Sequence, residues 1–167
     1  MQLSCEGNCC PDPTPSSANK QQSVLQQERE QKLTAQELLK RYAAGEREFP
    51  DVDLSGQILK GVNLSGANLG GAKLHNTLLE EANLTGVNLS CANLHQVDLT
   101  RAILTGANLS EARLHRVNLQ DANLRGADLS GASFKQICLT GASLGGAILP
   151  DGSILLTNRL SSRLQCK

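Results

Sequence analysis

Apolar residues recur along this chain with a period of five. From Leu54 to Leu149 every fifth residue is leucine except Phe134, and the residue two before it is Ala, Val or Ile in 18 of 20 pentads, Gln57 and Thr77 being the exceptions. An α-helix of period 3.6 or a flat strand of period 2 cannot keep two residues of every five on one side over such a length. The pattern therefore predicts a chain that bends at each pentad and stacks on itself around a shared axis.

The length of one coil follows from positions that resemble each other twenty residues apart. Three columns repeat at this spacing: His75, His95 and His115, continued by Lys135; Glu81, Arg101 and Asp121, which alternate in charge; and the glycines at positions 66, 86, 106, 126 and 146. Charge alternation is what neighbouring strands favour. We therefore predict four pentads per coil and five coils over residues 52–151, a stack about 24 Å tall at a strand spacing of about 4.8 Å.

Pentads such as Ala67-Asn68-Leu69-Gly70-Gly71 match the consensus Ala-(Asp/Asn)-Leu-x-x, and the chain thereby resembles the pentapeptide repeat family. The resemblance implies an all-β fold, a right-handed quadrilateral parallel β-helix of about five coils with a short N-terminal capping α-helix. Its square core would be filled by the central residues of the pentads, in one column Leu54, Leu74, Leu94, Leu114 and Phe134. The segments Leu39–Gly45 and Leu149–Ser153 are similar to those of cyanobacterial members, so we expect a cyanobacterial-type protein.

Composition divides the remainder of the chain. Residues 1–19, with three prolines among Ser, Asn and Asp, are typical of a disordered leader. Residues 20–45 are predicted to form a helical N-terminal cap, although residues 20–33 can also continue the leader. The β-helix is expected over residues 46–153, and residues 154–167 form a C-terminal cap or tail.

The cap has recognisable helix signals. Thr34 and Glu37 form a capping-box pattern, in which each side chain satisfies a free backbone donor of the other. The helix that follows places Leu38, Leu39 and Tyr42 on one face, where they can plug the first coil, and Gly45 ends it. Ends that remain open expose strand edges, so we expect a monomer or a weak end-to-end dimer.

Charge and cysteine content exclude several classes of protein. Sixteen acidic residues balance sixteen basic ones, so no net field recruits nucleic acid or an anionic membrane. No apolar run is long enough to span a membrane and the start of the chain lacks signal-peptide features, so we expect a cytoplasmic protein. The six cysteines do not form a disulfide framework. Cys5, Cys9 and Cys10 are interpreted as a mobile thiol cluster rather than a metal, redox or lipidation site.

Catalysis requires converging groups, whereas a square β-helix offers flat walls with parallel side chains. We therefore predict no enzyme, no cofactor and no metal. The histidine column can be interpreted as a metal or proton site, or as exposed positions that tolerate stacking, and the second interpretation is favoured. The histidine wall is otherwise basic, with Asp53 as its one carboxylate. The candidate partner-binding face comprises Lys73, His75, His95, Arg113, His115, Arg116 and Lys135.

The surface pattern predicts a non-enzymatic scaffold that presents flat charged faces to an unidentified protein partner, not to nucleic acid or a membrane. The resemblance implies an alternative, because some pentapeptide repeat proteins mimic duplex DNA and bind DNA gyrase. Residues 49–151 contain nine acidic and seven basic residues, a poor imitation of phosphates. A structural protein without a dedicated partner is a third possibility. Ile58 and Leu78 share one column and occupy positions of the repeat that are expected to face outward. They either form a docking patch or are covered by residues 20–33.

Overall fold

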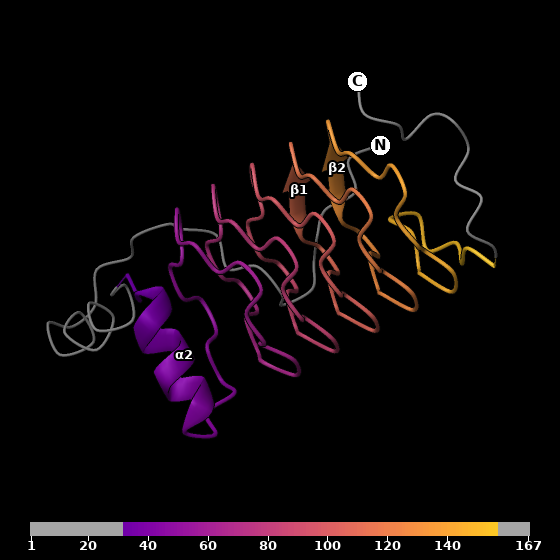
Figure 1. The fold of residues 1–167 in the computed structure, drawn as a ribbon. Helices are drawn as coiled ribbons and strands as arrows, with labels where there is room; N and C mark the ends of the chain where they lie inside the picture. The colour runs from indigo at the N-terminus through magenta and orange to yellow at the C-terminus, as the bar shows by residue number, and fades with distance from the viewer. Residues whose placement is uncertain (1–31, 157–167) are drawn as a thin grey trace, which may run out of the picture.

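The computed structural model of this chain describes residues 32–156. Its elements are helix α2 (Ala35–Ala43), strand β1 (Arg113–His115) and strand β2 (Ser133–Lys135). After α2 the chain winds through successive coils that lie in a row, with α2 at the N-terminal end (Figure 1). Within the described part no helix is both long and apolar enough to cross a membrane. The predictions for residues 1–31 and 157–167 lie outside the described residues.

Parallel backbone pairing joins residues that lie twenty positions apart. Asn93 pairs with Arg113, and Arg113 with Ser133, where β1 and β2 run parallel. The Leu94 N–H donates to the Arg113 carbonyl at 3.0 Å, and the Asn93 N–H donates to the Ala72 carbonyl of the preceding coil at 2.9 Å. Equivalent bridges recur at every fifth residue, so the spacing of twenty predicted from the repeat is confirmed.

Each coil contributes one pentad to each of four sides, which we number as walls by their central residues. Wall 1 contains the pentads centred on Leu54, Leu74, Leu94, Leu114 and Phe134; wall 2 those on Leu59, Leu79, Leu99, Leu119 and Leu139; wall 3 those on Leu64, Leu84, Leu104, Leu124 and Leu144; wall 4 those on Leu69, Leu89, Leu109, Leu129 and Leu149. The residue two after each central residue forms the corner to the next wall.

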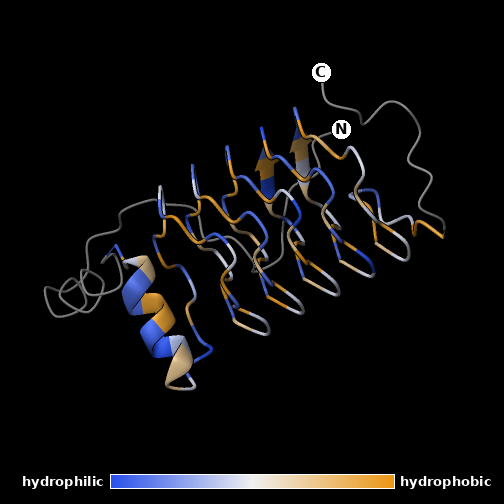
Figure 2. Ribbon diagram, viewed as in Figure 1, coloured by the Kyte–Doolittle hydropathy of each residue, from blue (hydrophilic) through white to orange (hydrophobic). Residues whose placement is uncertain are grey.

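The core consists of the central residues and the small residues two before them. Every central leucine from Leu54 to Leu129 is at most 2% exposed, and apolar backbone segments recur at matching places in successive coils (Figure 2). Phe134 is only half-buried, because the described chain stacks no further coil above it on wall 1. The repeat also begins one pentad earlier than the leucine pattern, since Phe49 is buried and Glu48 pairs with Asn68.

The two exceptions to the small-residue rule have polar roles. Thr77 is fully buried, and its hydroxyl donates to the Leu54 carbonyl at 3.0 Å. The Gln57 side-chain oxygen accepts the Ala35 N–H at 3.1 Å and so satisfies a free donor at the start of α2. Gln57 therefore joins the helix to the first coil, and Thr77 joins the first coil to the second.

Helix α2 begins and ends with capping interactions. Thr34 Oγ1 accepts the Glu37 N–H at 3.2 Å, as the sequence predicts. The reciprocal bond is not formed, because the Glu37 carboxylate pairs instead with Arg41 Nε at 3.1 Å, a charge-assisted contact one turn along the helix. At the other end Gly45, with φ +97°, donates to Tyr42 and allows Glu46 to donate to Arg41, the Schellman arrangement.

Helix α2 packs against the first coil. Leu38 is fully buried, and Leu39 and Tyr42 are partly buried against the core. The Tyr42 hydroxyl donates to the Ser65 carbonyl at 2.8 Å. Just before the helix, Lys32 pairs with Asp53 of wall 1 in a parallel bridge, so the helix predicted for residues 20–33 does not extend to its last residues. At Lys32 the chain pairs with the backbone of wall 1 instead of forming a helix.

The last coil is covered in part by a reversal of the chain. Ile148 pairs antiparallel with Ile154, and the Leu155 N–H donates to the Ala147 carbonyl at 2.9 Å. Leu155 is partly buried against the core, whereas Leu156 is 88% exposed. The hairpin thus closes wall 4 at this end.

Candidate functional site

The histidines lie in one column on wall 1. The Asn76 N–H donates to the His95 carbonyl and the Gln96 N–H to the His115 carbonyl, both at 2.9 Å, so the three rings stand on consecutive coils. His95 and His115 meet edge to face, with ring centroids 6.4 Å apart. Within residues 32–156 no group of three or more His, Cys, Asp or Glu is placed to hold a metal ion.

Serine hydroxyls hold two of these imidazoles. His75 Nδ1 lies 2.7 Å from Ser55 Oγ, and His115 Nε2 lies 3.2 Å from Ser133 Oγ. Sequence reasoning missed both serines. The spacing of twenty does contain the signal, because Ser55 shares the column of His75, and Ser133 is the partner of Arg113 in the next coil.

The predicted bases are exposed on the same wall. Lys73 and Arg113 stand in one column, Lys135 continues the histidine column, and Arg116 occupies the corner to wall 2. In the described part of the chain none of these four residues is in an ion pair. Wall 1 therefore presents positive charge that its own side chains leave largely uncompensated.

Asp53 is the carboxylate of wall 1, and it stands in the first coil. Burial by itself would raise the pKa of Asp53, but hydrogen bonds from the Ser55 side chain and N–H and the charges of Lys73 and Lys32 outweigh burial and hold that pKa below its ordinary value. Asp53 is thus ionised and partly offsets Lys73. The positive charge is concentrated further along the stack, at Arg113, Arg116 and Lys135.

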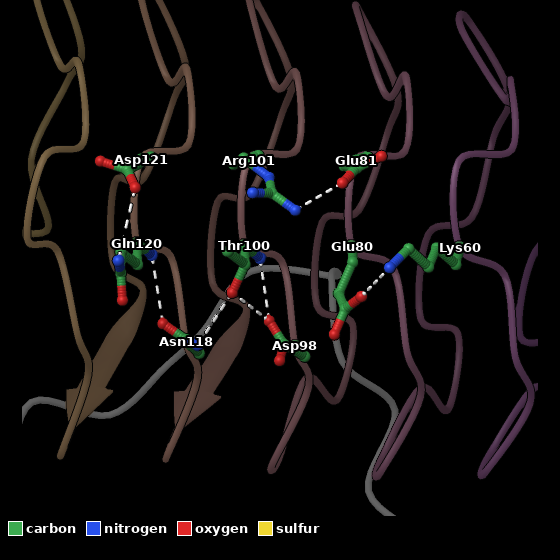
Figure 3. A network of polar contacts seen from close by, with 9 residues as sticks. All are labelled: Lys60, Glu80, Glu81, Asp98, Thr100, Arg101, Asn118, Gln120 and Asp121. Carbon is green, nitrogen blue, oxygen red and sulfur yellow. Dashed lines mark hydrogen bonds and ion pairs between the residues drawn. The ribbon is translucent and has the colours of Figure 1, made fainter.

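Wall 2 carries charges of both signs that pair with each other. Lys60 Nζ lies 2.7 Å from Glu80, and Arg101 pairs with Glu81 one coil away (Figure 3). The hydrogen bond to Glu80 and the charge of that carboxylate raise the pKa of Lys60. Most of the formal charge on this wall is therefore satisfied internally.

Polar side chains continue the wall 2 network along the stack. Thr100 donates to Asp98, and the Asn118 amide donates to the Thr100 hydroxyl at 2.8 Å (Figure 3). The Gln120 N–H in turn donates to Asn118 Oδ1 at 3.2 Å. Walls 1 and 2 thus differ in their bases, because Lys60 and Arg101 of wall 2 are in ion pairs and the four bases of wall 1 are in none among residues 32–156.

The corners of the coils have positive φ angles, the conformation that glycine adopts without strain. At the corner between walls 3 and 4 all five residues from Gly66 to Gly146 are glycine. At the corner between walls 1 and 2 only Gly56 is glycine. The next four residues keep side chains at φ between 56° and 59°: Asn76, Gln96, Arg116 and Gln136. Non-glycine residues with positive φ also occur at three positions each of the corners between walls 2 and 3 and between walls 4 and 1. Strained side chains are thus shared by three of the four corners.

Comparison with known families shows what this repeat is. The family profile described as Pentapeptide repeats matches residues 48–86, 67–106 and 107–146, with 8 copies. The matched residues make up more than half of the chain. This chain belongs to the pentapeptide repeat family.

Solved structures of other pentapeptide repeat proteins are similar to this one. A protein of the Arabidopsis thaliana thylakoid lumen shares 32% identity at a TM-score of 0.57, over 60% of this chain and 70% of its own. The protein alr5209 of Nostoc PCC 7120 shares 36% identity at a TM-score of 0.50, over 68% of this chain and 78% of its own. Rfr23 of Cyanothece 51142 shares 42% identity at a TM-score of 0.49, over 55% and 58%.

The first two of these relatives are a plant and a cyanobacterial protein, so the expected kinship with cyanobacterial members is confirmed. A comparison of the sequence with curated proteins gave no match. Pentapeptide repeat proteins fold as right-handed β-helices and are generally structural or interaction proteins.

The cysteines of the repeats lie away from the histidine column. Cys91 stands at the corner between walls 4 and 1, and Cys138 stands on wall 2. Cys138 is disulfide-bonded, which its position in the repeat did not predict. The predictions for Cys5, Cys9 and Cys10 lie outside the described residues.

Proposed function

We propose that this pentapeptide repeat protein is a non-enzymatic scaffold that binds another protein through wall 1 of a right-handed quadrilateral β-helix. One observation supports this most directly. The bases of wall 1 have no ion-pair partner within residues 32–156, whereas Lys60 and Arg101 of wall 2 are paired. Uncompensated charge on a rigid flat surface steers a complementary partner and fixes its orientation.

The arrangement of the wall 1 side chains favours binding over catalysis. His75, His95 and His115 project side by side from consecutive coils, and a catalytic centre requires a nucleophile, a base and an orienting group that converge on one point. The serines that contact His75 and His115 also lie on wall 1, in neighbouring coils. A scaffold role also agrees with the general character of the family.

Mimicry of duplex DNA towards DNA gyrase is less well supported by the charges. Such a mimic requires a strongly acidic surface, but residues 49–151 hold nine acidic and seven basic residues, and wall 1 has the wrong sign. We expect DNA supercoiling by gyrase to be unaffected at micromolar concentrations of this protein. Inhibition in that assay would favour the mimic over the scaffold.

Affinity capture tests the scaffold proposal. The full chain is immobilised and exposed to cytoplasmic extract, since we propose the cytoplasm as its compartment, and its captured partner is compared with that of the variant Arg113→Glu, Arg116→Glu, Lys135→Glu. All three residues are exposed, so the circular dichroism spectrum should not change while capture is lost. The control variant Lys40→Glu, Arg125→Glu, with both residues outside wall 1, should capture normally. Undiminished capture by the triple variant would reject wall 1.

A further inference from the structure

The positive charge of wall 1 is centred on strands β1 and β2. Arg113 and His115 belong to β1, and Lys135 stands beside His115 on β2. Arg116 directly follows β1 at the corner. We call these four residues, with Gln136, the β1–β2 patch. At a strand spacing of about 4.8 Å, three permanent cations and an imidazole are carried by two neighbouring coils.

Among residues 32–156 no carboxylate is in an ion pair with this patch. Glu111 precedes β1 at the corner between walls 4 and 1, and its carboxylate lies over Gly131 of the next coil, where a Cβ would stand 2.3 Å from Glu111 Oε1. Glu111 is thus directed along its own corner. Asp53, the carboxylate of wall 1, lies three coils below β1.

The patch also contains two residues in a strained conformation. Arg116 and Gln136 both have φ of 56°, and a side chain in this left-handed region costs about 1–2 kcal/mol. Arg116 Nε donates to Gln136 Oε1 at 3.0 Å, which fixes the guanidinium and leaves its terminal nitrogens as donors.

The chemistry of the patch fits carboxylates on a narrow segment. Two guanidinium groups favour planar oxyanions, which they bind with paired hydrogen bonds. Duplex DNA is a wide polyanion, and specific binding to it uses many phosphate contacts. Here the walls beside the patch carry Asp98, Asp121 and Asp128, which are in no ion pair among residues 32–156, and these would repel a ligand wider than wall 1.

From these observations we infer that the β1–β2 patch binds a carboxylate-rich, extended segment of the partner protein. This inference deepens the proposed scaffold function and rests on it. Arg113, Arg116 and Lys135 supply the charge, His115 and Gln136 supply further hydrogen bonds, and Gln136 holds the Arg116 guanidinium in place. Attraction of this kind is screened by salt.

Fluorescence anisotropy with defined peptides tests the inference on the full chain. The probe is a fluorescein-labelled peptide of about ten alternating Glu and Ser residues, roughly twice the length needed to cross a wall of five residues; the comparison probe replaces Glu by Lys. We expect saturable binding of the Glu peptide alone, weakened at least about tenfold by Arg113→Glu, Lys135→Glu and by raising salt from about 0.05 M to about 0.3 M. The variant Lys40→Glu, Arg125→Glu changes the net charge equally and should bind normally.

A second variant separates binding from folding. Gln136→Gly relieves the strain at the corner, so it should raise the thermal unfolding midpoint and yet weaken peptide binding several-fold. Equal binding by wild type and the Arg113, Lys135 variant, or no binding to wild type, overturns the inference. Tighter binding of a duplex DNA of about 20 base pairs than of the Glu peptide also overturns it. If the peptide fails while capture from extract still depends on wall 1, the inference falls and the scaffold proposal stands.

Discussion

At the residue scale, the side chain before each central leucine explains the composition of the pentad. In most pentads this residue is Asn or Asp, and its side-chain oxygen accepts the N–H two residues later. Asn93 accepts from His95 at 3.2 Å, and Asn108 accepts from Ser110 at 3.0 Å. A buried or half-buried N–H without a partner is costly, so this local bond favours Asn and Asp where the chain turns.

Ile103 breaks this rule, and its replacement is a test. Ile103 stands at the Asn position of wall 3, has no side-chain oxygen and is 41% exposed. We expect Ile103→Asn to accept the Thr105 N–H and to stabilise the fold by about 0.5–1 kcal/mol. Urea unfolding measures the difference. Ile103→Ala, which removes apolar area without supplying an acceptor, is the control and should give no such gain.

At the element scale, helix α2 closes the N-terminal end of the stack. Leu38 is fully buried against the first coil, and Tyr42 donates to the Ser65 carbonyl at 2.8 Å. Gln57 satisfies the first turn of the helix from the coil side. A coil without this cover would expose apolar side chains and an open strand edge, which promotes association.

Removing the cap tests its role. Deletion of residues 1–45 should convert the protein into soluble oligomers or a precipitate, because the first coil then presents an unpaired edge. Size-exclusion chromatography with light scattering measures the outcome. A deletion variant that stays monomeric and as soluble as the full chain would show that α2 is dispensable as a cover.

The C-terminal hairpin includes a carboxylate whose ionisation contributes to stability. Ser153 donates from its side chain at 2.6 Å and from its N–H at 3.0 Å to Asp151, and these two bonds lower the pKa of Asp151. A lowered pKa means that the contribution is present above about pH 4, the ordinary value for Asp, and is lost as the pH falls through the lowered pKa.

The pH dependence of unfolding measures this contribution. Asp151→Asn should have a lower thermal midpoint than wild type at about pH 6, and the two midpoints should converge towards about pH 2.5. Ser153→Ala, which removes one donor, should show a smaller pH dependence than wild type. If the difference in thermal midpoint between wild type and Asp151→Asn stays constant with pH, the stabilisation by Asp151 comes from packing rather than from its charge.

How much of this element structure follows from sequence depends on the range of the interactions. The period of five and the columns at twenty are repeated many times, so the coil length is fixed by pattern alone, and the caps at Thr34 and Gly45 follow from local chemistry. The pairing of Lys32 with Asp53 and the bond of Gln57 to α2 are single long-range contacts. No repeat signals such contacts, so the sequence does not reveal them.

At the scale of the whole molecule, four walls with the same core carry different surfaces. The spacing of twenty predicts that the three histidines share a wall with Lys135, and the contacts from Ser55 to Ser133 place them there. Which bases remain uncompensated is not visible in sequence, because Glu111 lies two residues before Arg113 along the chain but is directed over Gly131 in space. The walls therefore acquire their separate character from the stacking of coils.

The central claim is that the β1–β2 patch exists because four pentads close one coil, and two pentad deletions test it most directly. Both remove one wall 3 pentad and leave every patch residue in the chain. Deleting residues 122–126 separates Arg113 from Lys135 by three pentads instead of four and moves Lys135 to another wall, whereas deleting residues 102–106 leaves both on one wall. With unchanged circular dichroism, anisotropy with the Glu peptide should show several-fold weaker binding for the first deletion than for the second. Equal binding by the two would contradict the account.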